Sequence, residues 1–282
     1  MTAPDRRTAL RAGLAVLGTA AASAGLAACS DGRNTRAAAG AAGATGAAGT
    51  AQPGAASASP PSPGANPPGS SASPSGRTQP LAASPAEVDH AETGRAQVAL
   101  TFHGDGDPQV AQALLSEAES GGARLTVLAV GRWLGDHPEM ARRVLDGGHE
   151  LGNHTENHVD ISRLSPSAAF AEIEACAARL RKLTGSPGVW FRPSQTQHAD
   201  PVLVDQARRA GYRTVLSYDV DPLDYEDPPA AQIAQRLLAA VHPGAVVSMH
   251  LGHQHTVEAL PAVLAGLKSR GLAAVTASEL FS

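Results

Sequence analysis

The sequence predicts an α/β domain of about seven βα units, whose parallel strands close into a distorted (β/α)7 barrel. Three observations predict this fold. Strand-like and helix-like patterns alternate from residue 91 to residue 282, no short sequence repeat occurs, and most of the branched aliphatic and aromatic residues lie in this part of the chain. Regular alternation implies a parallel sheet with right-handed crossovers, and an open doubly wound sheet is the alternative to closure.

The first βα unit shows both patterns clearly. The apolar run at residues 98–102 stops at a Gly/Asp turn, which is typical of a buried strand. Asp107 and Pro108 then begin a helix, because proline is favoured at the first helical position and apolar residues follow at helical spacing.

The remaining elements follow in order, and most of them are bounded by Gly or Pro. Gly147 and Gly148 end the second helix, and Ser165 and Pro166 open a long third helix. We expect the other strands at residues 124–130, 149–153, 190–191, 214–218, 245–250 and 272–276. We expect the other helices at residues 138–145, 165–185, 201–210, 229–241 and 257–269.

The N-terminal residues 1–29 have the pattern of a bacterial export signal. Arg6 and Arg7 precede an uncharged run of about 17 residues that is short and weakly apolar for a membrane span. The adjacent arginines resemble a twin-arginine signal, and the sequence Leu-Ala-Ala before Cys29 resembles a lipobox. We therefore expect an exported protein, lipid-anchored through Cys29 on the outer face of the cytoplasmic membrane, in the cell envelope.

Residues 30–90 consist mainly of Ala, Gly, Ser, Pro and Thr, and bury too little apolar surface to offset the entropy of ordering them. We expect a disordered tether with a root-mean-square span of roughly 40 Å. The net charge of −4 has no concentrated basic face, which disfavours nucleic acid as a partner, and we expect a monomer. Cys176 lies in a helical pattern and is expected to be a small buried residue, so no disulfide follows.

Polar side chains gather where the predicted strands end. Parallel α/β folds place their active sites at the rim formed by the carboxyl ends of the strands. The residues at or just beyond these ends are His103, Asp105, His154, His158, Arg192, Asp219, Asp221 and His250. This convergence predicts one functional site.

His154 and His158 are four residues apart, a spacing that would bring both imidazoles to one face of a helical turn, close enough to share a divalent ion. The HxxxH pattern is common, but here it ends a longer string, Gly-His-Glu-Leu-Gly-Asn-His-Thr at residues 148–155. That string resembles the second motif of the polysaccharide deacetylase family, the NodB-homology carbohydrate esterases.

The other motifs of this family occur in the same order across residues 98–277. The Phe-Arg-Pro sequence at residues 191–193 resembles the third motif, and residues 218–221, followed by Asp224 and Tyr225, resemble the fourth. The apolar run at residues 246–250, which ends in His250, resembles the fifth. The Ser-Gln-Thr-Gln sequence at residues 194–197 departs from the aromatic-Gly continuation of the third motif.

The resemblance implies a metal-dependent hydrolase that removes N-acetyl groups from amino-sugar residues of a cell-envelope polysaccharide such as peptidoglycan. By the same resemblance His154 and His158 bind the ion, expected to be Zn²⁺ with Co²⁺ or Ni²⁺ as alternatives, and His250 is the catalytic acid. Arg192, with Asp219 or Asp221 as its acidic partner, orients and tunes the base or the acid.

The first motif is where this chain departs from the family. His103 stands in place of the catalytic-base Asp, and Gly104 in place of the metal-binding Asp. In one arrangement Asp105 binds the metal and His103 is the base; in a second Asp107 is the ligand, although it also suits a helix N-cap. In a third His103 joins His154 and His158 around the ion, and Asp105 or Asp107 is the base. We prefer an Asp ligand.

The same departure keeps other functions open. One is a catalytically impaired lipoprotein that keeps the fold and binds glycan; another is a related metallohydrolase acting on a different amide or on an O-acyl ester. His253 and His255 either line the substrate rim or are solvated loop residues, and the same two alternatives hold for His198. The two tryptophans are expected in the core.

Overall fold

The computed structural model describes residues 86–92 and 94–282. The signal expected at residues 1–29 and most of the tether expected at residues 30–90 lie outside the described residues. Among the described residues, no helix is both long enough and apolar enough to cross a bilayer.

Most of the described strands follow the expected order. They are β1 (Glu87–Val88), β2 (Gln97–Gly104), β3 (Thr126–Ala129), β4 (Glu150–Asn153), β5 (Val215–Leu216), β6 (Val246–His250) and β7 (Ala273–Val275). The strand expected at residues 190–191 is reduced to Phe191, which bridges to Asn153 on one side and to Val215 on the other. β1 is a strand that the sequence did not predict.

Helices connect these strands. They are α1 (Pro108–Ser120), α2 (Gly131–Asp136), α3 (Glu139–Asp146), α4 (Pro166–Thr184), α5 (Pro201–Arg209), α6 (Ala230–Ala240), α7 (Gln254–Ser269) and α8 (Ala277–Leu280), with short 3₁₀ turns η1 (Ile161–Arg163) and η2 (Asp224–Glu226). The short helices α2 and α8 were not predicted.

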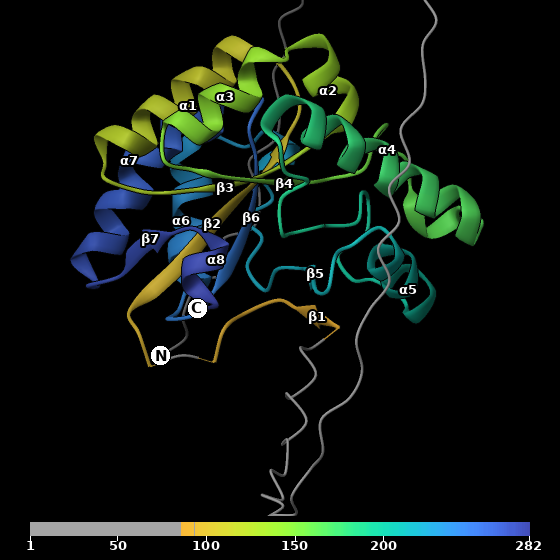
Figure 1. The fold of residues 1–282 in the computed structure, drawn as a ribbon. Coiled ribbons are helices and arrows are strands. Elements are labelled where there is room, and N and C mark those ends of the chain that lie inside the picture. Colours follow the sequence, from red (N-terminus) through yellow and green to blue (C-terminus); the bar gives the residue numbers. More distant parts are fainter. Residues whose placement is uncertain (1–85, 93) are drawn as a thin grey trace, which may run out of the picture. The chain divides into compact units, whose positions relative to one another are not determined.

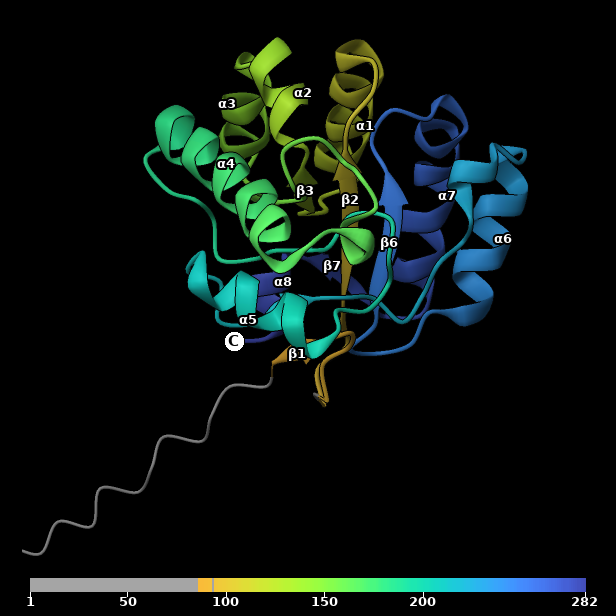
Figure 2. The ribbon, with the colours of Figure 1, turned by 90° about the vertical axis from the view of Figure 1, so that its right-hand side faces the viewer.

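Parallel pairing joins the strands into an irregular ring. β4, β3, β2 and β6 are neighbours in that order, and β7 pairs with the first residues of β2. Single bridges at Phe191 complete the ring from β4 to β5, and a bridge from Val220 to Val247 completes it from the segment after β5 to β6. The expected distorted barrel of parallel strands is therefore confirmed. The helices lie outside the strands, with α6 and α7 on one side and α4 and α5 on the other (Figures 1 and 2).

The helix boundaries follow from local chemistry. Asp107 accepts a hydrogen bond from the Gln109 N–H and so caps α1, with Pro108 at the first helical position. Ser165 caps α4 in the same way, and Gly185 closes that helix with φ of 85°, a conformation that favours glycine. α8 begins at a capping box formed by Thr276 and Glu279, which the sequence analysis overlooked.

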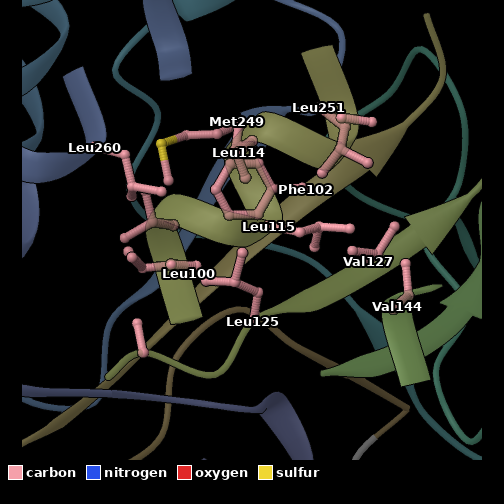
Figure 3. Close-up of a cluster of buried hydrophobic side chains, with 14 of the residues drawn as sticks. Leu100, Phe102, Leu114, Leu115, Leu125, Val127, Val144, Met249, Leu251 and Leu260 are labelled. Carbon is pink, nitrogen blue, oxygen red and sulfur yellow. The ribbon is translucent and has the colours of Figure 1, made fainter. Parts of the chain in front are cut away.

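A continuous apolar layer holds the ring to the helices. Figure 3 shows Phe102 and Leu100 of β2 beside Leu114 and Leu115 of α1, and all four side chains are fully buried. Because β2 lies between β3 and β6, this layer fixes the strand that carries His103.

The folded part begins before residue 91, earlier than expected. β1 pairs with β5, and His90 and Ala91 lie beside the start of β6, where the Ala91 N–H donates to the Gly244 carbonyl. His250 ends the same strand. The first described residues therefore reach the end of β6 that is opposite to His250.

Candidate functional site

Three histidines converge above the end of β2. His103 belongs to β2, and His154 and His158 lie in the loop after β4. One nitrogen of each ring lies within 4.8 Å of those of the other two, and this is the group of possible metal ligands that the described residues contain. The ring centroids of His103 and His154 are 4.3 Å apart, and those of His154 and His158 are 4.9 Å apart.

The loop that carries His154 and His158 is not helical, so the expected helical turn was wrong. Thr155 has φ of 68° and His158 has φ of 54°, so the backbone is left-handed at both residues. The Asn153 side chain accepts a hydrogen bond from the Thr155 N–H at 2.8 Å, and the Thr155 hydroxyl accepts one from the His158 N–H at 3.2 Å. Left-handed backbone at non-glycine residues costs energy and is typical of functional sites.

His154 is oriented as a metal ligand would be. Its Nδ1 lies 3.0 Å from the Arg192 carbonyl oxygen, so Nδ1 carries the proton and donates it. Its Nε2 is buried and has no hydrogen-bond partner. An unprotonated imidazole nitrogen without a partner, beside two further imidazoles, fits a divalent cation.

The electrostatics of the cluster favour neutral imidazoles. Burial, followed by the neighbouring imidazoles, lowers the pKa of His103 and of His154 well below the usual value of 6.5. Burial also lowers the pKa of His158, although the Asp105 carboxylate opposes this shift. Metals bind the neutral form, so the rings are in the state that a ligand requires.

Neither aspartate of the first motif belongs to this group. Asp107 uses its carboxylate to cap α1. Asp105 accepts from the Gly106 N–H at 2.9 Å and pairs with Arg132 at 3.3 Å, although it lines a hollow next to His103 and His158. The preferred ligand set, with one Asp, is therefore not the set that the structure brings together.

His250 is held by a carboxylate that the sequence analysis did not assign. Asp224 is fully buried, and its two oxygens accept hydrogen bonds from the His250 N–H and from His250 Nδ1, both at 2.8 Å. The Thr256 hydroxyl donates a third at 2.7 Å. The signal was present in the sequence, because Asp224 is the second acid of the Asp-x-x-Asp pattern in the fourth motif.

Of the two aspartates that were predicted as acidic partners, one lies outside the cleft and the other lines it. Asp219 is a correction: it accepts from the Val246 N–H and pairs with His242 at 2.7 Å, at the start of β6 rather than at its end. Asp221 does line the cleft, where its carboxylate accepts from the Leu223 N–H and burial raises its pKa.

Arg192 is completely buried and does not make the predicted pair with a carboxylate. Its Nε and Nη2 donate to the carbonyl oxygens of Leu216 and Ser217, each at 3.0 Å, and Nη1 has no partner. Burial lowers the pKa of Arg192 to about 10. The guanidinium charge in turn contributes to the lowered pKa values of His103 and His154.

His103, His158 and His250 line a cleft of about 490 Å³, and His154 is buried behind it. Its walls are polar and aromatic, and its lining residues include His103, His158, His250, Gln195, Gln197, Tyr218, Asp221 and Tyr225. Tyr225 is 51% exposed and its ring centroid lies 5.7 Å from that of His250.

Of the remaining histidines, one lies beside the cleft and two pair with carboxylates, and both tryptophans lie in the interior. His253 lines the hollow beside the cleft, whereas His255 pairs with Asp227 at 3.0 Å. His198 lies 3.5 Å from the Glu87 carboxylate, beside β1. Both tryptophans are buried, and Trp133 donates to the Gly106 carbonyl, which supports the loop after β2.

Comparison with known proteins agrees with this geometry. The model of the polysaccharide deacetylase family matches residues 90–215. A peptidoglycan-N-acetylglucosamine deacetylase of Bacillus cereus is 33% identical over 187 residues, which are 65% of this chain and 87% of that protein. The uncharacterized protein YlxY of Bacillus subtilis is 29% identical over 157 residues, which are 56% of this chain. The chain spans about half of that relative, 48% of its length.

Solved structures give the same fold. A CE4 family pseudoenzyme from Bacillus anthracis superposes with a TM-score of 0.67 at 24% identity, covering 71% of this chain and 70% of that one. A peptidoglycan N-acetylglucosamine deacetylase bound to a naphthalenyl N-oxidanyl-benzamide gives a TM-score of 0.65 at 25% identity, covering 70% and 92%. The chain therefore belongs to the polysaccharide deacetylase family, whose hydrolases act on the carbon–nitrogen amide bond of N-acetyl groups.

Proposed function

We propose that this chain is a metal-dependent deacetylase of amino-sugar residues in a cell-envelope polysaccharide, with peptidoglycan as its substrate. One observation carries the proposal: His103 and His158, which lie in one group with the buried His154, line the same cleft as His250, which Asp224 holds in place. A relative that is 33% identical is a peptidoglycan deacetylase, which supports the choice of polymer.

The residues of the chain have separate tasks in this reaction. Asp224 accepts the Nδ1 proton of His250, so Nε2 is the nitrogen that passes a proton to the departing sugar amine. A divalent ion held by His154, His158 and a third ligand would, when bound, supply polarisation of the acetamide carbonyl and a lower pKa for the attacking water. Proton acceptance from that water falls to Asp221 or Asp105, the carboxylates that line the cleft and the hollow beside it.

The cleft walls suit a sugar chain. Gln195 and Gln197 bring amide groups to the opening, and the exposed ring of Tyr225 offers an apolar face of the kind that stacks on a pyranose. Trp133 and Trp190 are buried and take no part in this contact.

The location of the protein is also a proposal. The twin-arginine and lipobox patterns of residues 1–29 and the low-complexity composition of residues 30–90 support export and a lipid anchor at Cys29. Metabolic labelling with a radioactive fatty acid should mark the chain, and Cys29→Ser should abolish the label.

The activity is tested with His154→Ala. The zinc-loaded full chain should release acetate from N-acetylated glycan strands, and the variant should show no release above background, because it lacks the ligand whose Nε2 is free. His90→Ala is the matched control, since His90 lies beside the start of β6, at the opposite end from His250. Circular dichroism checks that both variants fold. Retained release in the folded His154→Ala variant would contradict the proposal.

A second candidate is a glycan-binding protein without activity. The His103–Gly104 pair, in place of two aspartates, and the similarity to a pseudoenzyme of the CE4 family favour it. Such a protein should bind glycan strands yet liberate no acetate with added Zn²⁺, Co²⁺ or Ni²⁺. A panel of N-acetyl and O-acetyl substrates tests the remaining candidate, a hydrolase of another amide or of an O-acyl ester, for which the altered loop at residues 194–197 is the reason.

A further inference from the structure

We infer that His103 is the third ligand of the metal, so that the centre is built from three imidazoles and contains no carboxylate. The inference rests on the proposed function in one respect only, the binding of a divalent ion at this site. It assigns to His103 a different task from that of the residue it replaces, since the family resemblance puts the catalytic base at this position.

The alternation of side chains along β2 favours His103 over Gly104 as the position of a metal ligand. Consecutive residues of a strand point to opposite faces. His103 faces the cleft, whereas a Cβ at Gly104 would lie 2.8 Å from Val127 Cγ1 and 3.0 Å from Ala129 Cα. Position 104 therefore points into packed strand residues and cannot present a side chain to the ion without moving the backbone.

The two aspartates that follow are committed to other contacts. Asp107 caps α1, and a helix that loses such a cap is destabilised, so moving this side chain to the ion has a cost. Asp105 pairs with Arg132 and closes its own turn with the Gly106 N–H. Within the described residues, no carboxylate oxygen joins the three imidazole nitrogens that lie within 4.8 Å of one another.

Strand pairing and a hydrogen bond to Ser248 fix the position of the His103 ring. β2 pairs with β3 on one side and β6 on the other, and His103 itself aligns with Leu128 and with His250. Its Nε2 lies 3.1 Å from the Ser248 hydroxyl. His154 is fixed in the same manner by the Arg192 carbonyl oxygen. Metal-binding imidazoles generally have such a partner, which sets the ring orientation.

A site of three imidazoles has a different ion preference from one with a carboxylate. Three neutral donors leave the full double charge of the cation in place, and the buried Arg192 guanidinium adds positive charge nearby. Imidazole nitrogen suits Zn²⁺ and Ni²⁺, whereas carboxylate oxygen suits Mg²⁺ and Mn²⁺. We therefore expect tight Zn²⁺ binding and no measurable Mn²⁺ binding.

The experiment is X-ray absorption spectroscopy of the zinc-loaded full chain in a Cys29→Ser background, which removes a competing thiol. The spectrum should show three imidazoles per zinc. His103→Asn should reduce this number to two and weaken Zn²⁺ binding by at least about 100-fold, because even the partners of metal ligands contribute about 10- to 100-fold. His90→Asn, beside the start of β6 and away from the three imidazoles, is the matched control and should leave both values unchanged.

A second variant keeps the test independent of folding. His103→Asp restores a carboxylate at the same position, so it should bind zinc through two imidazoles and an oxygen and should gain Mn²⁺ binding. Unchanged Mn²⁺ binding in folded His103→Asp, or two imidazoles per zinc in the parent chain, overturns the inference and leaves the proposed function standing. Three imidazoles without acetate release support the inference and overturn the proposed function. A chain that takes up no zinc overturns both.

Discussion

The carboxylate of Asp224 is fully buried and accepts three hydrogen bonds. Two of them come from His250. The bond from Nδ1 fixes which nitrogen of His250 is free. A neutral amide in the same position can donate to Nδ1 instead, which reverses the tautomer. The chemistry of His250 therefore depends on a residue that does not itself line the cleft.

We predict that Asp224→Asn lowers kcat for deacetylation by about 10²- to 10⁴-fold, the range expected when a general acid is lost or its tautomer is wrong. Zinc binding should not change, because Asp224 does not contact the three imidazoles. Steady-state kinetics and a zinc titration measure the two effects. Asp227→Asn, an exposed acid that pairs with His255, is the control and should keep normal kcat. Equal losses in both variants would contradict the assignment.

At the scale of single residues, the sequence predicted the histidines better than the acids. His154, His158 and His250 stand in unaltered motifs, and all three open onto one site or contribute to it. Asp219 was wrongly placed because the segment after β5 runs beside β6 from its first residues, with Val220 aligned with Val247. That register depends on pairing between segments far apart in the chain, which local sequence does not specify.

At the scale of elements, helix-capping and helix-breaking residues predicted the helix boundaries best. Asp107–Pro108 and Ser165–Pro166 placed the starts of α1 and α4 correctly, because these boundaries depend on neighbouring residues. The short elements β1, α2 and α8 were missed, since two to six residues give no measurable periodicity. The loop after β4 was mistaken for a helical turn because the i, i+4 spacing is the same in both, and only the positive φ angles distinguish them.

The loop at residues 194–197 supports the loop that carries His154 and His158. Gln195 donates from Nε2 to the His158 carbonyl at 2.7 Å, and Gln197 donates to the Tyr218 carbonyl at 2.9 Å. We predict that Gln195→Ala weakens Zn²⁺ binding by about 10-fold, because partners of metal ligands contribute about 10- to 100-fold. Gln197→Ala, on the same loop, should leave zinc affinity unchanged. Calorimetric titration of both variants checks this, and identical affinities for the two would refute it.

At the scale of the whole molecule, side-chain interactions join the strands at both ends of the barrel. The histidines and their partners occupy one end, and the Asp219–His242 pair joins the opposite end, where β6 begins. The hydrogen bond from His242 to the Pro243 carbonyl, and then the bond to Asp219, raise the pKa of His242. A raised folded-state pKa means that the protonated ring stabilises the fold at pH values below the usual 6.5, and that this contribution is lost as pH rises through the folded-state pKa.

We predict that His242→Asn lowers the free energy of unfolding more at pH 5.5 than at pH 8.5. The difference should be below about 1 kcal/mol, since the pair is partly solvated and screened. Urea unfolding at the two pH values measures it. Asp219→Asn should also reduce the difference, because it removes one of the groups that raise the pKa. A larger loss at pH 8.5 would show that the sign is wrong.

The position of the first described residues bears on how the protein meets its polymer. His90 and Ala91 lie beside the start of β6, and His250 ends the same strand. Under the proposed anchor at Cys29, the chain would enter the described domain at the end of β6 that lies opposite to His250. The attachment point of the proposed tether would then leave the cleft at the other end of the barrel free for a polysaccharide strand.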